Sequence, residues 1–132
     1  MTTRAGDGGY FSSLDEAECR KLLASSVVGR VAWETPEGIN VLPVNHRVVG
    51  DRIVFHTSLN GPLSTLLEPT RVGFQVDEID AETAVGWTLL VRGTTGPAVG
   101  LESVSWVPDG RRVGVAITFE WISGRVVSGF PS

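Results

Sequence analysis

The fold is decided by residues 42–57, which read LPVNHRVVGDRIVFHT. Apolar and polar residues alternate on both sides of Gly50-Asp51, a pair that favours a two-residue hairpin turn. If these two residues form the turn, position 49 pairs with position 52, and Asn45 lies opposite His56. Side chains alternate between the two faces of a strand, so this pairing also fixes which residues share a face. The sequence therefore predicts an antiparallel ribbon with two chemically different faces.

The two faces of this ribbon predict a core side and a polar side. The core side carries Leu42, Val44, His46, Val48, Ile53 and Phe55. The polar side carries Pro43, Asn45, Arg47, Arg52, Val54 and His56. It gathers several hydrogen-bond donors, two of them permanently cationic, and so suits a phosphate or another anion. An ordinary solvent-facing polar surface is the alternative, and by geometry alone the commoner one.

The rest of the chain also alternates as strands do. Strands are predicted over residues 27–33, 39–49, 52–57, 71–79, 87–94 and 113–122. A helix is predicted over residues 14–25, begun by a capping box of Ser13 and Glu16. A short helix is predicted from Pro62, with Leu63, Leu66 and Leu67 on its buried side. We expect a mostly β fold with short helices, a six-stranded antiparallel barrel, in which residues 1–11 are a flexible tail and residues 12–132 form one domain.

Composition excludes several classes of protein. The 132 residues are 42% hydrophobic and 20% charged, as in a globular domain with one core. The net charge is −4 and the eleven Lys and Arg residues form no cluster, which argues against nucleic-acid binding. No apolar run is long enough to span a membrane, and the start lacks a signal-peptide pattern. The single cysteine cannot form an internal disulfide, so we expect a cytoplasmic protein.

Other candidates for chemistry are weak. The two histidines fall on opposite faces of the ribbon, so we expect no metal site. Asp77, Glu78, Asp80 and Glu82 form an acidic run that is typical of a solvated sheet edge. Cys19 is expected in the core, and no nucleophile elbow or glycine-rich phosphate loop is present. Of the four tryptophans, Trp106 lies in a proline-flanked loop and is the candidate to cover a pocket.

Several segments occur in an order that identifies a family. They are the leucine-rich helix leading into Val28-Gly29-Arg30, then LPVNH at 42–46, DRIVFHT at 51–57, VDEID at 76–80, GWTLLVRG at 86–93, WVPDG at 106–110 and SGR at 123–125. Over residues 10–127 this set resembles the FMN-binding split-barrel family, the proteins related to pyridoxamine 5'-phosphate oxidase.

The resemblance implies a homodimer that holds FMN, or a related deazaflavin coenzyme, in a groove between the subunits. The phosphate would lie near the second and third strands and the short helix that follows. Carried onto this chain, the cofactor-binding positions are Asn45, His46, Arg47, His56, Thr57, Ser58, Asn60, Gly61 and Leu63. The implied ligand is a small molecule, with neither nucleic acid nor membrane as a partner.

One position departs from the family pattern. Its members usually carry a lysine or arginine in the turn that opens the short helix, whereas residues 58–63 here read SLNGPL. Phosphate binding at this turn would therefore rely on the backbone amides of Gly61, Leu63 and Ser64. Three functions stay open: a flavin- or deazaflavin-dependent oxidoreductase acting on a small organic substrate, a non-catalytic binder of a flavin-like or other small aromatic ligand, and a repurposed barrel with cofactor-free chemistry.

Overall fold

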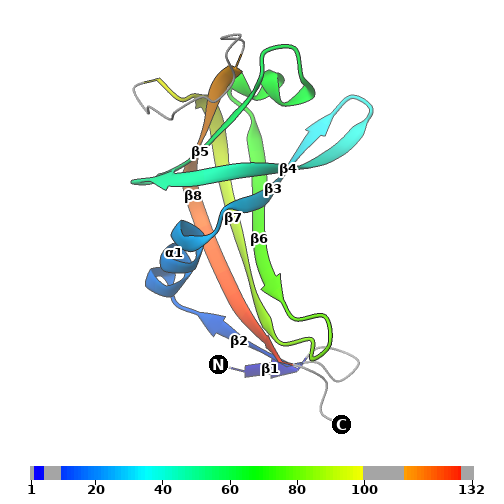
Figure 1. The fold of residues 1–132 in the computed structure, drawn as a ribbon, viewed down its shortest axis with the longest axis vertical. Coiled ribbons are helices and arrows are strands. Elements are labelled where there is room, and N and C mark those ends of the chain that lie inside the picture. The colour runs from blue at the N-terminus through cyan, green and yellow to red at the C-terminus, as the bar shows by residue number, and fades with distance from the viewer. Residues whose placement is uncertain (1, 5–9, 100–111, 129–132) are drawn as a thin grey trace.

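Six antiparallel strands close into a barrel in the computed structural model, which describes residues 2–4, 10–99 and 112–128. The strands are β3 (Val28–Thr35), β4 (Gly38–Val49), β5 (Arg52–Ser58), β6 (Arg71–Ile79), β7 (Gly86–Pro97) and β8 (Arg112–Ser128). The order around the ring is β8, β5, β4, β3, β6 and β7, and β7 pairs with β8 again to close it (Figure 1). The predicted antiparallel barrel is therefore confirmed, and each of its six strands lies where the sequence predicts one.

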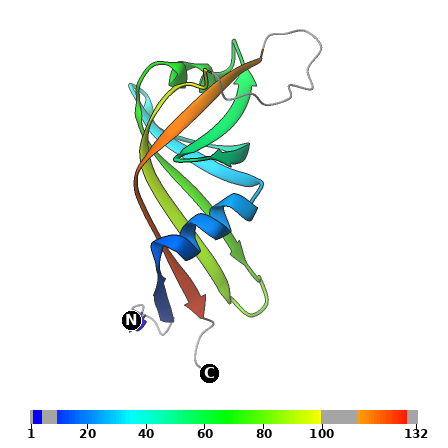
Figure 2. The same ribbon diagram turned by 90° about the vertical axis from the view of Figure 1, so that its left-hand side faces the viewer.

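The helix α1 (Glu16–Ser25) packs against the side of the barrel (Figure 2). Its capping box uses Asp15 and Glu18 rather than the predicted Ser13 and Glu16. Asp15 accepts from the Glu18 amide at 2.8 Å, and the Glu18 carboxylate accepts from the Asp15 amide. The prediction of the cap was wrong by two residues because Ser13 belongs to a strand and Asp is as good a cap as Ser.

Two short strands precede α1 where the sequence predicts a loose tail. They are β1 (Thr2–Arg4) and β2 (Tyr10–Leu14). β2 pairs with the last residues of β8, and β1 pairs with β2, both antiparallel. The length of β8 explains this addition, because its C-terminal half runs past the end of the ring and offers a free edge for hydrogen bonding.

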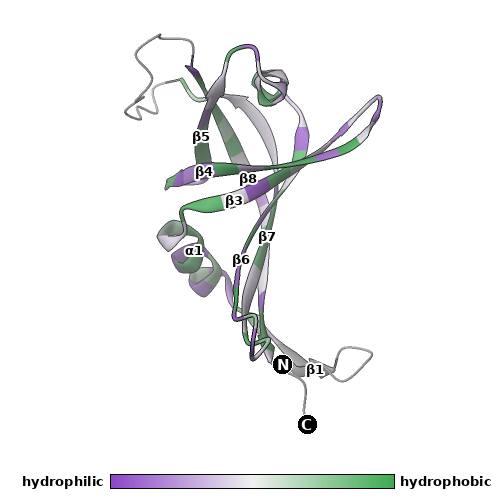
Figure 3. Cartoon of the chain, turned by 45° about the vertical axis from the view of Figure 1, so that its right-hand side comes forward, coloured by the Kyte–Doolittle hydropathy of each residue, from purple (hydrophilic) through white to green (hydrophobic). Residues whose placement is uncertain are grey.

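Side chains alternate between the inner and outer faces along each strand. Figure 3 shows hydrophobic and hydrophilic residues following one another along the β3–β4 hairpin. On β3, Gly29, Val31 and Trp33 are buried, whereas Val28 and Arg30 are exposed. Gly29 is required by packing, since a Cβ there would stand 2.2 Å from Cζ of Phe74. The period of two predicted from the sequence is thus the period that builds the barrel wall.

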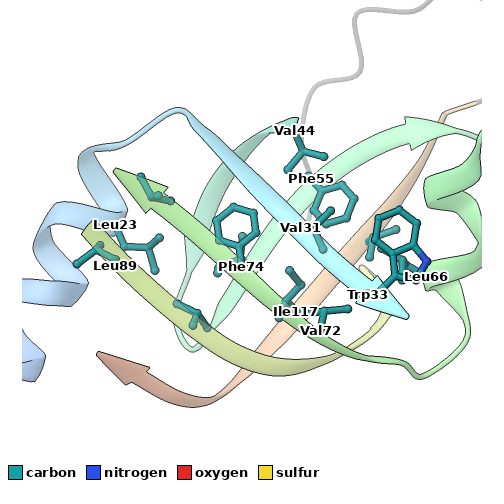
Figure 4. Packing of buried hydrophobic residues seen from close by; sticks show 14 of the residues in the cluster. Leu23, Val31, Trp33, Val44, Phe55, Leu66, Val72, Phe74, Leu89 and Ile117 are labelled. Carbon is teal, nitrogen blue, oxygen red and sulfur yellow. The ribbon is translucent and has the colours of Figure 1, made fainter. Parts of the chain in front are cut away.

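The core fills the barrel with branched and aromatic side chains (Figure 4). Phe55 and Phe74 are its largest fully buried side chains. The 3-10 helix η1 (Pro62–Leu67) lies at the end of the barrel remote from β1 and places Leu66 in this core beside Trp33. The predicted buried side of the short helix is confirmed. No helix among the described residues is long and apolar enough to cross a membrane.

Candidate functional site

The β4–β5 hairpin has the register that its turn residues predict. His46 pairs with Phe55 and Arg47 with Val54. His46 and Phe55 are buried on the inner face, and Arg47 is half-buried on the outer face. The ladder ends at the His46–Phe55 pair, because β4 continues along β3 and β5 continues along β8. Asn45 accordingly pairs with Val28 of β3 rather than with His56, which corrects that part of the predicted pairing.

Three basic side chains gather where β5 meets its neighbours on the outer face. We call Arg47, His56 and Arg112 the cationic cluster. Burial, followed by the positive charges of Arg112 and Arg47, lowers the pKa of His56 below its usual 6.5. Nη2 of Arg112 donates to the backbone carbonyl of His56 at 3.0 Å. His56 is therefore neutral at pH 7, between two permanent positive charges.

Two buried apolar residues lie on the same face as the cationic cluster. Val54 pairs with Arg47 on one side and with Ala116 of β8 on the other. Val54 is 1% exposed and Ala116 is 4% exposed, so neither offers an open surface to a ligand in this structure. The basic groups themselves suit the anionic group of a ligand.

A glycine on β8 makes room for the imidazole of His56. Gly114 pairs with His56, and a Cβ at position 114 would stand 3.1 Å from His56 Nε2 and 3.0 Å from the Cβ of Ala98. Such contacts are tighter than those of most Cβ atoms, so the imidazole would have to shift. Gly114 therefore leaves the space that the imidazole of His56 occupies within the cationic cluster.

The turn before η1 already uses most of the backbone amides that the resemblance assigns to a phosphate. The amide of Gly61 donates to the Ser58 carbonyl, and the amide of Ser64 donates to the Gly61 carbonyl, both at 3.1 Å. Two of the three amides assigned to a phosphate are thus already used within the turn, which leaves Leu63. Leu63 packs its side chain against the core, and Asn60 is exposed.

Two of the expected cofactor-binding residues point into the barrel. Thr57 is 8% exposed, and His46 is 7% exposed with its ring edge-on to Phe74 at 5.0 Å between centroids. Nε2 of His46 lies 3.4 Å from the Leu23 carbonyl, while Nδ1 is buried without a hydrogen-bond partner. Burial lowers the pKa of His46. These two side chains belong to the core rather than to the cationic cluster.

Comparisons with known proteins agree with this barrel. The family model for pyridoxamine 5'-phosphate oxidase matches residues 15–109. The chain belongs to the pyridoxamine 5'-phosphate oxidase family. A Mycobacterium tuberculosis protein of uncharacterised function, Rv0080, is 30% identical over 129 residues, covering 87% of this chain and 85% of that protein.

Solved structures show the same family architecture. An FAD-binding protein from Mycobacterium smegmatis is 25% identical with a TM-score of 0.70, covering 88% of this chain and 97% of its own. An FAD-binding protein from Mesorhizobium loti shares the fold at 20% identity and a TM-score of 0.71, covering 92% and 99% respectively.

The structure places some of the predicted site residues close together and adds one residue that the sequence did not predict. It brings Arg47 and His56 together, with Ser58 exposed next to them on β5 and opposite Arg112. Arg112 was not predicted, because only the pairing of β5 with β8 brings it to His56. The one signal in the sequence was its place directly before the predicted last strand. Trp106, expected to cover the pocket, lies outside the described residues.

Metal binding finds no support among the residues that the structure describes. They contain no group of three or more His, Cys, Asp or Glu side chains placed to hold a metal ion. The two histidines lie on opposite faces of the β4–β5 ribbon, one buried in the core and one in the cationic cluster. The candidate site offers nitrogen donors, which suit an anionic ligand.

Proposed function

We propose that this protein binds a flavin at the outer face of β4, β5 and β8 and acts as an oxidoreductase on a small organic substrate. One observation carries the proposal: three basic groups from three strands lie close together on this face. The names of related proteins add support, since the similar Mycobacterium smegmatis protein is an FAD-binding protein. FMN carries a phosphate, the kind of group that these basic side chains suit.

Each residue of the cationic cluster would make a different contact with the phosphate of the flavin. Arg47 and Arg112 supply permanent positive charge for a phosphate. His56 is neutral at pH 7 and would donate one N–H, and Gly114 leaves room for its ring. The bound flavin supplies hydride transfer, and the barrel holds and orients it. FMN and a deazaflavin coenzyme both carry a phosphate that could use these contacts.

The test is a titration of FMN and riboflavin into variants of the cationic cluster. Arg47→Ala and Arg112→Ala should each weaken FMN about tenfold, because each removes one charge-assisted contact, and should leave riboflavin unchanged. Arg71→Ala is the matched control, since Arg71 is an exposed arginine at the start of β6, outside the cluster. Equal FMN affinity in all four proteins would show that the phosphate does not bind here.

A non-catalytic flavin binder is the second candidate, and the absence of a cation in the turn of residues 58–63 keeps a cofactor-free barrel as the third. Loading the protein with FMN and adding NADH or NADPH without oxygen distinguishes the two functions. Loss of the flavin's absorbance at catalytic rates supports the oxidoreductase. A flavin that stays oxidised supports the binder, and a protein that takes up no flavin supports the cofactor-free barrel.

We propose that the active form is a homodimer with the ligand groove between subunits. The outer face of β3 and β4 exposes Val28, Val41 and Ile39 at 52%, 55% and 72%, on neighbouring strands of one hairpin. A second copy packed there would cover these side chains and would border Asn45, which pairs with Val28. Sedimentation at micromolar concentration should show twice the chain mass of 14.1 kDa. The variant Val28→Glu/Val41→Glu should sediment as a monomer, and a wild-type monomer would refute the proposal.

A further inference from the structure

A separate cleft opens at the end of the barrel that η1 covers. It lies between the tip of the β3–β4 hairpin and η1, with a volume of about 430 Å³. Trp33 and Asn40, which pair with each other across β3 and β4, form one wall, and Pro62 and Thr65 of η1 form the other. The volume falls within the usual range for small-molecule sites, and barrel mouths are common places for them.

The rim of this cleft is acidic. Glu34 and Glu37 line it, and both are exposed. No lysine, arginine or histidine is among its lining residues, and neither glutamate forms an ion pair within the described part of the chain. The two carboxylates cannot hold a metal ion alone, and no third ligand joins them there. An organic cation is therefore the ligand that this rim would attract.

A buried donor faces the same space. Trp33 is 4% exposed, and its indole N–H donates to no acceptor among the described residues. The ring nitrogen points toward η1, beside Leu66 (Figure 4). Among the described residues the only fully enclosed side-chain nitrogen or oxygen without a partner is Nδ1 of His46, so the indole nitrogen of Trp33 is not fully enclosed. Trp33 lines the cleft, where its N–H can donate to water or to an acceptor on a ligand.

We propose that this cleft binds a small organic ammonium compound that also carries a hydroxyl or carbonyl oxygen. The ammonium group lies at the Glu34–Glu37 rim, and the oxygen accepts from the indole N–H of Trp33. The amide of Asn40 offers a further polar contact, and the rings of Pro36 and Pro62 provide apolar walls. The site does not rest on the flavin proposal, because it shares no residue with the cationic cluster.

Three probes of matched length test the charge preference. They are aminobutanol, butanediol and hydroxybutyrate, which are cationic, neutral and anionic at pH 7. The full chain is titrated with each while the indole N–H signals are followed in a proton–nitrogen correlation spectrum, the Trp33 signal being assigned by its through-space contacts with Leu66. Aminobutanol should move the Trp33 signal saturably. Equal shifts with butanediol, or no saturable shift with aminobutanol, would overturn the proposal.

A pair of double variants tests the rim. Glu34→Gln/Glu37→Gln should weaken aminobutanol about five- to tenfold, since two partly exposed ionic contacts are lost. The control Glu78→Gln/Glu82→Gln removes the same charge from exposed positions outside the cleft and should bind as the wild type does. Equal weakening in both variants would mean that net charge, rather than the cleft, attracts the amine, and would refute the site. FMN affinity should be unchanged in both, so failure here leaves the flavin proposal standing.

Discussion

The buried histidine of the barrel core should make the protein acid-sensitive. His46 is 7% exposed, and burial lowers its pKa from the usual 6.5. The hydrogen bonds it makes with the backbone near Leu23 and Val27 oppose this shift only in part. The folded state therefore holds His46 neutral, whereas the unfolded chain takes up a proton as the pH falls through 6.5. Stability should be constant above that pH and decrease below it, by roughly 1 kcal/mol per pH unit until the lowered pKa is reached.

The assay is urea unfolding of the flavin-free protein at pH 7 and at pH 5.5, for the wild type and for His46→Leu. Leucine cannot take up a proton, and it has no buried nitrogen without a partner such as Nδ1 of His46. The variant should therefore lose little stability between these two pH values. His56→Gln is the control. Its pKa is also lowered, but His56 is less buried and contributes less, so this variant should keep most of the wild-type loss. Equal losses in the wild type and His46→Leu would refute the reasoning.

Two glycines give further predictions. Gly29→Ala would place a Cβ 2.2 Å from the buried ring of Phe74 and should destabilise the protein by about 1–3 kcal/mol in urea unfolding. Gly73→Ala on β6, which meets its nearest neighbour at an ordinary 3.7 Å, should change stability far less, and equal losses would contradict the packing argument. Gly114→Ala should displace His56 and weaken FMN several-fold without affecting riboflavin, as calorimetry can measure. Unchanged FMN affinity would show that the position of His56 does not matter for the phosphate.

Local patterns were enough to predict the barrel strands. Gly50-Asp51 fixes a two-residue turn, and the period of two on either side fixes the faces, so His46 and Arg47 were placed on the correct sides. The helix cap was missed by two residues because Ser13 and Asp15 are both good caps, and only the pairing of β2 with β8 shows that the chain is still extended at Ser13. The strand β2 itself was missed because its partner lies at the far end of the sequence.

The candidate site was harder to predict, because it depends on pairing between distant strands. Arg112 is 56 residues from His56 in the chain, and only the β5–β8 register brings them together. Asn45 was predicted to pair with His56 because the hairpin register was extended beyond the point where the two strands separate. A hairpin register extrapolates correctly only while the two strands stay paired, and here β4 leaves β5 after His46. The assignment of Trp106 stays a prediction, since that residue lies outside the described part of the chain.

The acidic rim of the cleft bears on what a cation beside Pro62 would do. Pro62 lines the same cleft as Glu34 and Glu37, so a lysine there would lie near two carboxylates and would be partly neutralised by them before it met a phosphate. Positive charge is instead held on β4 and β8, where the cationic cluster lies beside the buried Val54 and Ala116. Opposite charges thus occupy different parts of the barrel surface. An anionic ligand and a cationic one could then bind to the same chain without competing, and each proposed site can be tested while the other is left intact.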